Sequence, residues 1–191
     1  KELAVCSDKN IYKNINKTEK VRKLKKEKRR LQRKISRKYN KNRKGVRYCK
    51  TKNILKSEKR LLKINHRLTN IRHNYLHHVT SEIISRKPKF IVLEDLNVKG
   101  MMKNKHLARA IREQCFYEFY RQTEYKCCWN NIEFITADRY YPSSKMCCCC
   151  GNIKKDLKLK NRTYICAECG NVIDRDYQAS VNLKRYKELT A

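Results

Sequence analysis

Four cysteines near the carboxyl end of the chain have the spacing of a metal site. Cys147 and Cys150 form one C-x-x-C pair, and Cys166 and Cys169 form a second pair after 15 intervening residues. Two residues between thiolates let one tight turn present both sulfur atoms to the same tetrahedral ion, and a second turn completes the shell. We therefore expect these residues to bind one zinc ion. Because four thiolates leave no open position for water, that zinc would stabilise the fold without itself being catalytic.

Two glycines and two further cysteines lie beside the four expected ligands. Gly151 and Gly170 each follow a cysteine pair, at a position where the turn needs a residue that tolerates a positive φ. Cys148 and Cys149 lie inside the first pair, and only the outer two cysteines of this run keep two residues between ligands, so we expect the inner two not to be ligands. Reduced cysteines without metal and a redox pair remain as alternatives.

Three carboxylates are candidates for a second metal site. Glu94 follows the apolar run 90–93, and Asp174 and Asp176 open the last expected helix. Carboxylates at strand ends and helix starts are suitable ligands for hard divalent cations. The structural alternative is that the aspartates cap the helix and Glu94 pairs with a nearby lysine.

These residues must be positioned by a layer of strands and helices. Strands are expected at 3–6, 90–93 and 132–135, and helices at 107–127 and 176–186, and such alternation predicts an α/β fold. The 90–93 strand is expected to be buried. The expected buried face of the 107–127 helix carries Ile111, Cys115, Phe119, Gln122 and Tyr125 or Lys126.

Positive charge dominates the chain and is concentrated in its first half. The 49 Lys and Arg residues outnumber the 18 acids, which gives a formal net charge of +31. Residues 1–88 hold 30 of the basic residues and only six acids. Such an excess indicates a polyanionic partner, most plausibly nucleic acid, although a merely solvated surface is the alternative. The basic residues expected to contact nucleic acid are Arg22, Lys25, Arg29, Arg33, Arg37, Arg43, Arg47 and Arg60.

The basic region also has helical periodicity. Apolar residues recur every three, four or seven positions between Val21 and Tyr39 and every three or four between Leu61 and Val79, with a polar break at 40–45 and a stop at Pro88. This pattern predicts a basic antiparallel helical hairpin. The longest uninterrupted aliphatic or aromatic run, at 90–93, is far shorter than the roughly 20 residues that cross a membrane.

The expected segments follow from these patterns. They are a strand remnant at 1–10, the helical hairpin at 11–88, an α/β segment at 89–144, the zinc-binding segment at 145–172 and a final acidic segment at 173–191. The odd number of cysteines, 11, and the absence of an export signal favour a cytoplasmic protein with reduced thiols over a secreted disulfide scaffold.

Four stretches together resemble one family. Residues 90–100 (FIVLEDLNVKG), 138–145 (DRYYPSSK), the two C-x-x-C-G turns and residues 174–179 (DRDYQA) are similar to motifs of the TnpB family. These are transposon-associated, RNA-guided nucleases related to compact type V CRISPR effectors and to Fanzor proteins. The resemblance extends over nearly the whole chain.

The resemblance implies a RuvC-like, RNase H-type nuclease fold, here incomplete, with the basic helical hairpin as an insertion and a four-cysteine zinc ribbon. It implies guide RNA and target DNA as partners, a role in transposition and DNA recombination, and DNA cleavage with Mg²⁺ or Mn²⁺ held by three carboxylates. Matched by motif, Glu94 corresponds to the second catalytic acid and Asp176 to the third, with Asp174 as the alternate.

The chain departs from the family pattern in three places. Gln178 stands where the family usually has Asn, and the cysteine-rich run 146–149 replaces a more polar stretch. The first catalytic aspartate of the family lies just before the segment that 1–8 resembles, and Asp8 is a poor substitute for it. We therefore expect the chain to be a carboxyl-terminal portion of a nuclease that is inactive by itself. The alternatives are a zinc-ribbon nucleic-acid-binding protein without catalysis and a ribosome- or RNA-associated zinc protein.

Overall fold

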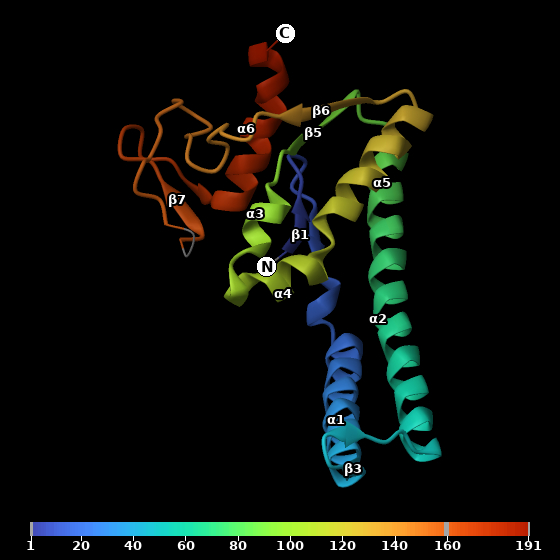
Figure 1. Cartoon of the computed structure of the whole chain (residues 1–191). Helices are drawn as coiled ribbons and strands as arrows, with labels where there is room; N and C mark the ends of the chain where they lie inside the picture. The colour runs from blue at the N-terminus through green and yellow to red at the C-terminus, as the bar shows by residue number, and fades with distance from the viewer. Residues whose placement is uncertain (1, 159–160, 191) are drawn as a thin grey trace. The chain divides into compact units, whose positions relative to one another are not determined.

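The computed structural model describes residues 2–158 and 161–190, which form two compact units (Figure 1). One unit comprises residues 14–77, and the other combines the first 13 residues with those from 78 onward. In chain order the elements are β1 (Glu2–Val5), β2 (Ile11–Lys13), the short 3₁₀ helix η1 (Ile15–Lys17), α1 (Glu19–Lys41), β3 (Arg43–Lys44), β4 (Arg47–Tyr48), α2 (Lys52–Ser85), β5 (Phe90–Glu94), α3 (Val98–Met102), α4 (Lys105–Gln114), α5 (Phe116–Trp129), β6 (Glu133–Ala137), β7 (Thr163–Ile165), β8 (Val172–Asp174) and α6 (Arg175–Thr190).

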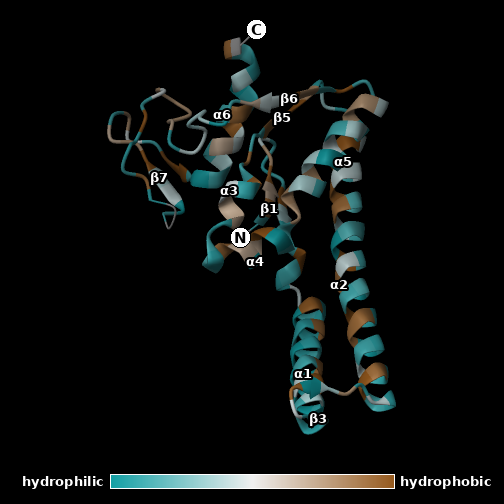
Figure 2. Ribbon diagram, viewed as in Figure 1, coloured by the Kyte–Doolittle hydropathy of each residue, from teal (hydrophilic) through white to brown (hydrophobic). Residues whose placement is uncertain are grey.

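The 14–77 unit is the helical hairpin that the periodicity predicts. Buried side chains from α1 and α2 form one narrow core, while the rest of α1 is mostly hydrophilic (Figure 2). Polar contacts near both ends establish that the helices are antiparallel: Tyr39 donates to Glu58 at 2.6 Å, and Arg72 donates to Asn16 at 2.8 Å. The buried residues of this core are Val21, Leu24, Leu31, Ile35, Ile64 and Leu68.

The turn of the hairpin and the extent of α2 refine that prediction. The polar break contains a two-residue antiparallel ladder, β3–β4, around Gly45, whose φ of 58° suits a residue without a Cβ. Helix α2 begins at Lys52, well before the predicted apolar series, and this additional stretch buries Ile54 completely. The helix ends at Ser85, before Pro88, as expected.

In the other unit, β5 and β6 form a parallel pair in which Phe90 lies opposite Glu133 and Glu94 lies opposite Ala137. Helices α3, α4 and α5 make the long connection that a parallel pair requires. Helix α6 contacts both strands. Strand β5 is only half-buried along its length, so the predicted full burial of this strand is wrong. The strand predicted at 3–6 is β1, and it pairs with β2, which the sequence pattern did not indicate.

The single helix predicted at 107–127 is also wrong, because the chain breaks there into α4 and α5 (Figure 1). Cys115 lies between them with a φ of 55°, in the left-handed region that helices do not use. Ile111, Phe119 and Gln122 are buried as predicted, whereas Cys115 marks the break and is only half-buried. The left-handed residue lets α4 and α5 run in different directions.

A buried lysine connects α5 to the end of α2. The Lys126 ammonium donates to the hydroxyl oxygens of Thr80 at 2.7 Å and Ser81 at 2.8 Å, and Thr80 in turn donates to the fully buried Gln122 at 3.2 Å. Burial lowers the pKa of Lys126, because it disfavours the charged form. These polar contacts fasten α5, whose first residues line the cavity described below, to the end of α2. None of the helices in the described part of the chain is apolar over a length that would cross a bilayer.

Candidate functional site

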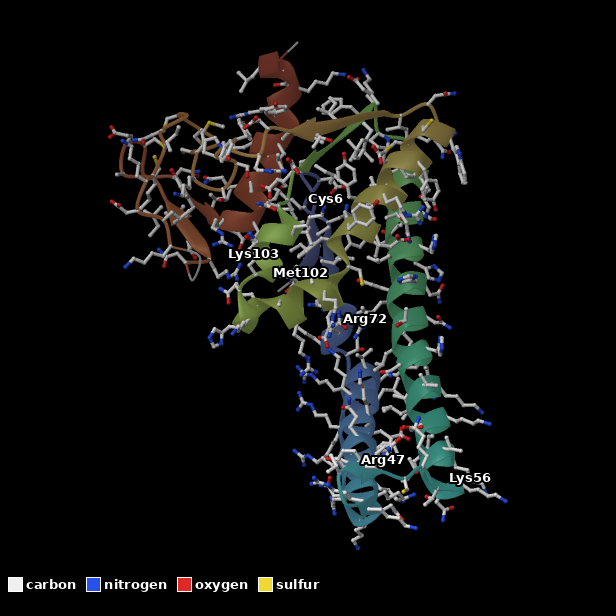
Figure 3. All side chains as sticks on the ribbon, viewed as in Figure 1. Cys6, Arg47, Lys56, Arg72, Met102 and Lys103 are labelled. Atoms are coloured by element: carbon white, nitrogen blue, oxygen red, sulfur yellow. The ribbon has the colours of Figure 1, made fainter. Side chains whose placement is uncertain are left out.

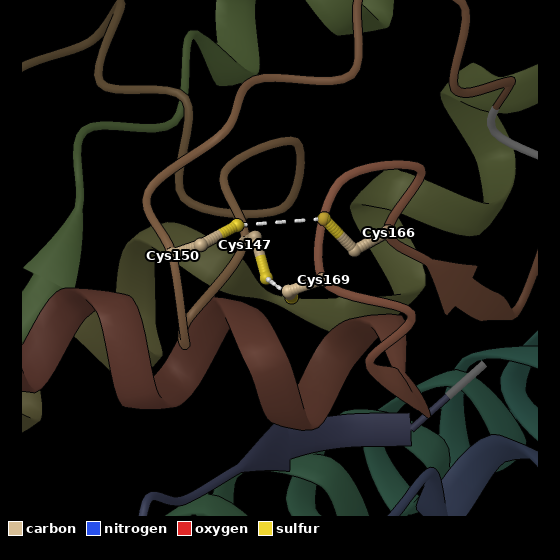
Figure 4. A group of neighbouring side chains, drawn as sticks. All are labelled: Cys147, Cys150, Cys166 and Cys169. Carbon is tan, nitrogen blue, oxygen red and sulfur yellow. Dashed lines mark hydrogen bonds between the residues drawn. The ribbon is translucent and has the colours of Figure 1, made fainter.

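The structure brings the four predicted zinc ligands together. The sulfur atoms of Cys147, Cys150, Cys166 and Cys169 all lie within 4.8 Å of one another (Figure 4). Cys147 and Cys166, the first cysteine of each pair, are buried, and the second of each pair is exposed. Among the described residues, no other group of three or more histidine, cysteine or acidic side chains lies close enough to hold one metal ion. The geometry therefore suits one tetrahedral ion.

The two cysteine turns have the same local structure. In each, the backbone N–H of the first cysteine donates to the carbonyl of an asparagine beyond the turn: Cys147 to Asn152 at 2.8 Å, and Cys166 to Asn171 at 2.9 Å. The glycine after each pair has the predicted positive φ, 78° at residue 151 and 68° at residue 170. The sequence alone therefore correctly indicated both turns.

Hydrogen bonds around Cys147 favour its thiolate. Burial would raise the pKa of this thiol, but the backbone N–H groups of Cys150 and Cys149 point at the sulfur and lower the pKa to about 6. The N–H of Cys149 lies 3.5 Å from that sulfur. Cys148 is buried beside Asn171 and Cys149 is exposed, and neither belongs to the group of four sulfur atoms. Cys147 thus presents a charged sulfur ligand before any metal binds.

A cavity of about 720 Å³ brings together two of the three candidate acids. Glu94 and Asp176 both line it, although they are far apart in the sequence. Its walls come from β1, the end of β5, the start of α5 and the first turns of α6, all within one unit. The cavity is therefore the place where both carboxylates can act on a common ligand.

Glu94 is held from the loop that follows β6. It ends β5 and is half-buried, and the hydroxyl of Ser143 donates a short hydrogen bond to its Oε1 atom. Ser143 itself is buried, with 4% of its surface exposed. Of the Glu94 oxygens, Oε2 accepts no hydrogen bond among the described residues, which leaves it available to a ligand in the cavity.

Asp176 lies in the first turn of α6 between two arginines. Its Oδ2 atom accepts from Arg162 at 3.0 Å, and its Oδ1 atom accepts from Arg175 at 2.8 Å. Both arginines also line the cavity. The site therefore combines carboxylate oxygens, which suit a hard cation, with guanidinium groups, which suit a phosphate.

The third candidate acid has a different role. Asp174 ends β8, and its Oδ1 atom accepts the backbone N–H groups of Asp176 and Tyr177, both at 2.9 Å. This is the arrangement of a helix cap, and Asp174 does not line the cavity. The structural alternative considered for both aspartates thus describes Asp174, whereas Asp176 faces the cavity.

Pattern reasoning missed three residues that contact the candidate acids. Ser143 lies within the DRYYPSSK stretch and Arg175 within DRDYQA, so the motifs contained them without indicating a role. Arg162 had no sequence signal, because its position opposite Asp176 depends on the β7–β8 hairpin. Two further acids, Glu2 and Asp95, also line the cavity, and Asp95 pairs with Arg139 at 2.6 Å.

The predicted nucleic-acid contacts lie in the helical unit. On α1, Arg22, Arg29, Arg33 and Arg37 are exposed and lie outside the buried seam, and Lys25 is half-buried. Figure 3 shows side chains that end in nitrogen atoms along both helices, and it labels Arg47. The remaining two are engaged in local contacts: Arg60 pairs with Glu27 at 2.6 Å, and Arg43 donates to the carbonyl of Gly45 at 2.8 Å.

A second basic surface lies on α2. A shallow groove of about 480 Å³ is lined along one side of this helix by cationic, imidazole and amide side chains and one isoleucine, with no carboxylate. None of its residues was among the predicted nucleic-acid contacts, which lie on α1, in the turn and nearer the start of α2. The lining residues are Lys63, His66, Arg67, Asn70, Ile71 and Asn74.

Comparison with known proteins finds relatives that are named RNA-guided DNA endonucleases or TnpB-like proteins. Residues 116–183 match the family model of the Cas12f1-like TNB domain. Over 69% of its length the chain is 37% identical to the "Putative RNA-guided DNA endonuclease" of Streptomyces pristinaespiralis, of which it covers 32%. Over 95% of its length it is 29% identical to the "Putative RNA-guided DNA endonuclease InsQ" of Escherichia coli, of which it covers 46%, and 27% identical to a TnpB-like protein of Acanthamoeba polyphaga mimivirus, of which it covers 31%. The chain spans less than half the length of these curated relatives.

The fold is also similar to that of a larger solved protein. The Cas12f1 chain in the cryo-EM structure of the Cas12f1–sgRNA–target DNA complex matches with a TM-score of 0.60 and 17% sequence identity. The match covers 93% of this chain and 44% of the Cas12f1 chain. At this identity the likeness shows a shared mixed α/β fold.

Proposed function

Because this chain belongs to the TnpB family, we propose that it is the metal-dependent catalytic portion of a transposon-associated, RNA-guided DNA endonuclease. The observation that carries this proposal is the cavity shared by Glu94 and Asp176. Glu94 at the end of a strand and Asp176 at the start of a helix correspond to two of the three carboxylates that the resemblance to a RuvC-like, RNase H-type site implies as ligands of divalent cations. A protein of the length of its relatives would act on target DNA.

The residues present fit a pair of Mg²⁺ or Mn²⁺ ions. Glu94 has one oxygen fixed by Ser143, and Asp176 can exchange its arginine partners for a cation. When bound, such cations activate water and stabilise the leaving oxygen of a phosphodiester. In the family, the first catalytic aspartate lies in a D-L-G strand just before the segment that residues 1–8 resemble, and β1, within that segment, lines the same cavity. Arg162 and Arg175, once released from Asp176, would bind the scissile phosphate.

The four-cysteine cluster would hold one structural zinc ion. Four sulfur atoms within 4.8 Å of one another, one of them already favoured as thiolate, suit this ion and leave no position for a reacting water. The second cysteine turn connects β7 to β8, and α6 begins directly after β8. The ion would therefore stabilise the segment that presents Arg162 and Asp176 to the cavity.

The helical unit would bind guide RNA and target DNA through their backbones. In RNA-guided nucleases base pairing reads the sequence, and protein lysines and arginines hold the duplex through its phosphates. The exposed arginines of α1 and the groove on α2, whose lining residues include no carboxylate, would supply such contacts. Binding would be tolerant of sequence and would weaken steeply with salt.

The test is cleavage of single-stranded DNA with Mg²⁺ or Mn²⁺ by this chain and by a version extended at its amino end by a D-L-G strand. We expect cleavage in the extended form only, and its loss in Glu94→Gln and Asp176→Asn. Cleavage that persists in both variants would contradict the assignment. If the extended form folds and binds nucleic acid in a salt-sensitive way but does not cleave DNA, the result would favour the alternative of a zinc-ribbon nucleic-acid-binding protein without catalysis.

A further inference from the structure

Ser143 is committed to Glu94 by its surroundings. It is buried, and its hydroxyl has one proton to donate, which goes to Oε1 of Glu94. A hydroxyl that binds one carboxylate oxygen fixes the rotation of the carboxyl group, so the orientation of the other oxygen is also set. Outer contacts of this kind are known to orient the carboxylate ligands of metal ions.

The position of Ser143 is in turn set by Asn182 on α6. The side-chain amide of Asn182, of which 1% is exposed, donates to the carbonyl oxygens of Ser143 and Met146, both at 2.7 Å. The backbone carbonyl of Asn182 accepts from the Tyr141 hydroxyl at 3.1 Å, on the other side of the same segment. Residues 141–146 are therefore fastened to α6 at both ends, with Ser143 between the two attachments.

The same helix carries Asp176 in its first turn. Asn182 and Asp176 thus belong to one rigid element, and the hydrogen bonds from Asn182 through Ser143 to Glu94 connect both acids to it. The orientation of the Glu94 carboxylate is thus coupled to the helix that carries Asp176. Met146, held by the same amide, directly precedes the first ligand of the four-cysteine cluster.

We propose that Ser143 and Asn182 are positioning residues that orient Glu94 for divalent cation binding in the cavity with Asp176. This inference rests on the proposed function, because it assigns Glu94 as a ligand. Neither residue needs to touch the cation: Ser143 acts through the carboxylate of Glu94, and Asn182 acts through the backbone of Ser143.

The probe is Mn²⁺, titrated into the chain supplied with one equivalent of Zn²⁺ and followed by the electron paramagnetic resonance signal of free Mn²⁺. Ser143→Ala should raise the dissociation constant about tenfold, in the range typical of removing a group that orients a metal ligand. Ser143→Thr keeps the hydroxyl and should restore binding to near the unsubstituted value. Asn182→Asp keeps the size but removes both amide donors, so it should weaken binding in the same direction. Ser85→Ala is the control, because this exposed serine lies outside the cavity and its loss leaves the hydrogen bond between Ser143 and Glu94 in place.

A double-mutant cycle separates positioning from general destabilisation. In a Glu94→Gln background Ser143→Ala should change Mn²⁺ binding no further, since its effect passes through the carboxylate. Equal Mn²⁺ binding by Ser143→Ala and the unsubstituted chain, while Glu94→Gln still loses it, would overturn the positioning role alone. Unchanged binding in Glu94→Gln and Asp176→Asn would instead overturn the cation site of the proposed function. If Ser143→Ala does not fold, Ser143→Cys, of similar size and a weak donor, takes its place in the cycle.

Discussion

The carboxylate of Asp174 accepts the backbone N–H of Asp176 at 2.9 Å, so two acids only two positions apart do different work. Asp174 closes the open end of α6, and Asp176 extends into the cavity that also contains Glu94. The structure therefore distinguishes the two acids of this motif. Asp174 caps the start of the helix, and Asp176, in its first turn, lines the cavity.

These different roles predict different effects of substitution at the two aspartates: a loss of stability at Asp174 and a loss of Mn²⁺ binding at Asp176. Asp174→Ala should lower the free energy of unfolding by about 1 kcal/mol, the usual cost of removing a helix cap, and leave Mn²⁺ affinity unchanged. Asp174→Asn, which can still cap, should restore the stability. Asp176→Asn should instead abolish Mn²⁺ binding. Thermal unfolding and Mn²⁺ titration of the same three variants check this, and loss of Mn²⁺ binding in Asp174→Asn would reverse the assignment.

The arginine beside Asp176 should compete with the cation. Arg162 occupies Oδ2 of this carboxylate at 3.0 Å, so a divalent ion must displace a charged partner to bind there. Arg162→Met removes the competitor and keeps much of the apolar volume, and it should therefore tighten Mn²⁺ binding several-fold at low ionic strength. Arg60→Met, which instead frees Glu27 in the helical unit, is the control, because neither residue lines the cavity. Weaker Mn²⁺ binding in Arg162→Met would show that the arginine supports the site.

The metal content of the cysteine variants should follow the geometry of the cluster. Cys147→Ser and Cys166→Ser remove buried members of the four and should lose the zinc equivalent, whereas Cys149→Ser, exposed and outside the four, should keep it. Native mass spectrometry measures the stoichiometry directly. Chelation of zinc should also lower the melting temperature of the chain. A full zinc equivalent in Cys147→Ser would contradict the ligand assignment.

Salt dependence should reveal the role of the helical unit. Replacing Arg29, Arg33 and Arg37 together by Gln should weaken binding to nucleic acids of different sequence alike. It should also reduce the slope of log K against log salt by roughly one for each phosphate that the protein no longer neutralises. Arg112→Gln, an exposed arginine of α4, is the single-site control. Fluorescence anisotropy with labelled oligonucleotides at several salt concentrations gives both values. An unchanged slope in the triple variant would direct attention to the groove on α2.

Local pattern predicted those parts of the fold that depend on residues close together in sequence. The apolar periodicity of α1 and α2 and the spacing of the cysteine pairs each describe a short segment, and the structure confirms both. The break at Cys115 was not predictable in this way, because the apolar residues on either side continue the period of one helix. The full burial expected of β5 was wrong, since that strand is only half-buried.

The candidate site likewise contains residues that the sequence pattern identified and residues that only the structure identifies. Glu94 and Asp176 were identified by residue type and motif, and the cavity that joins them is a tertiary feature. Ser143 and Arg162 reach these acids only after the loop following β6 and the β7–β8 hairpin have packed, so no local pattern marked them. Their roles depend on contacts between distant segments, which spacing alone does not encode.

Anomalous diffraction from crystals of the chain soaked in Mn²⁺ tests the central claim most directly. The account predicts an anomalous peak in the cavity within coordination distance of carboxylate oxygens of both Glu94 and Asp176, and its absence in Glu94→Gln crystals treated in the same way. A cavity without a peak at saturating Mn²⁺, or a peak that contacts neither acid, would contradict a shared cation site and with it the proposed chemistry.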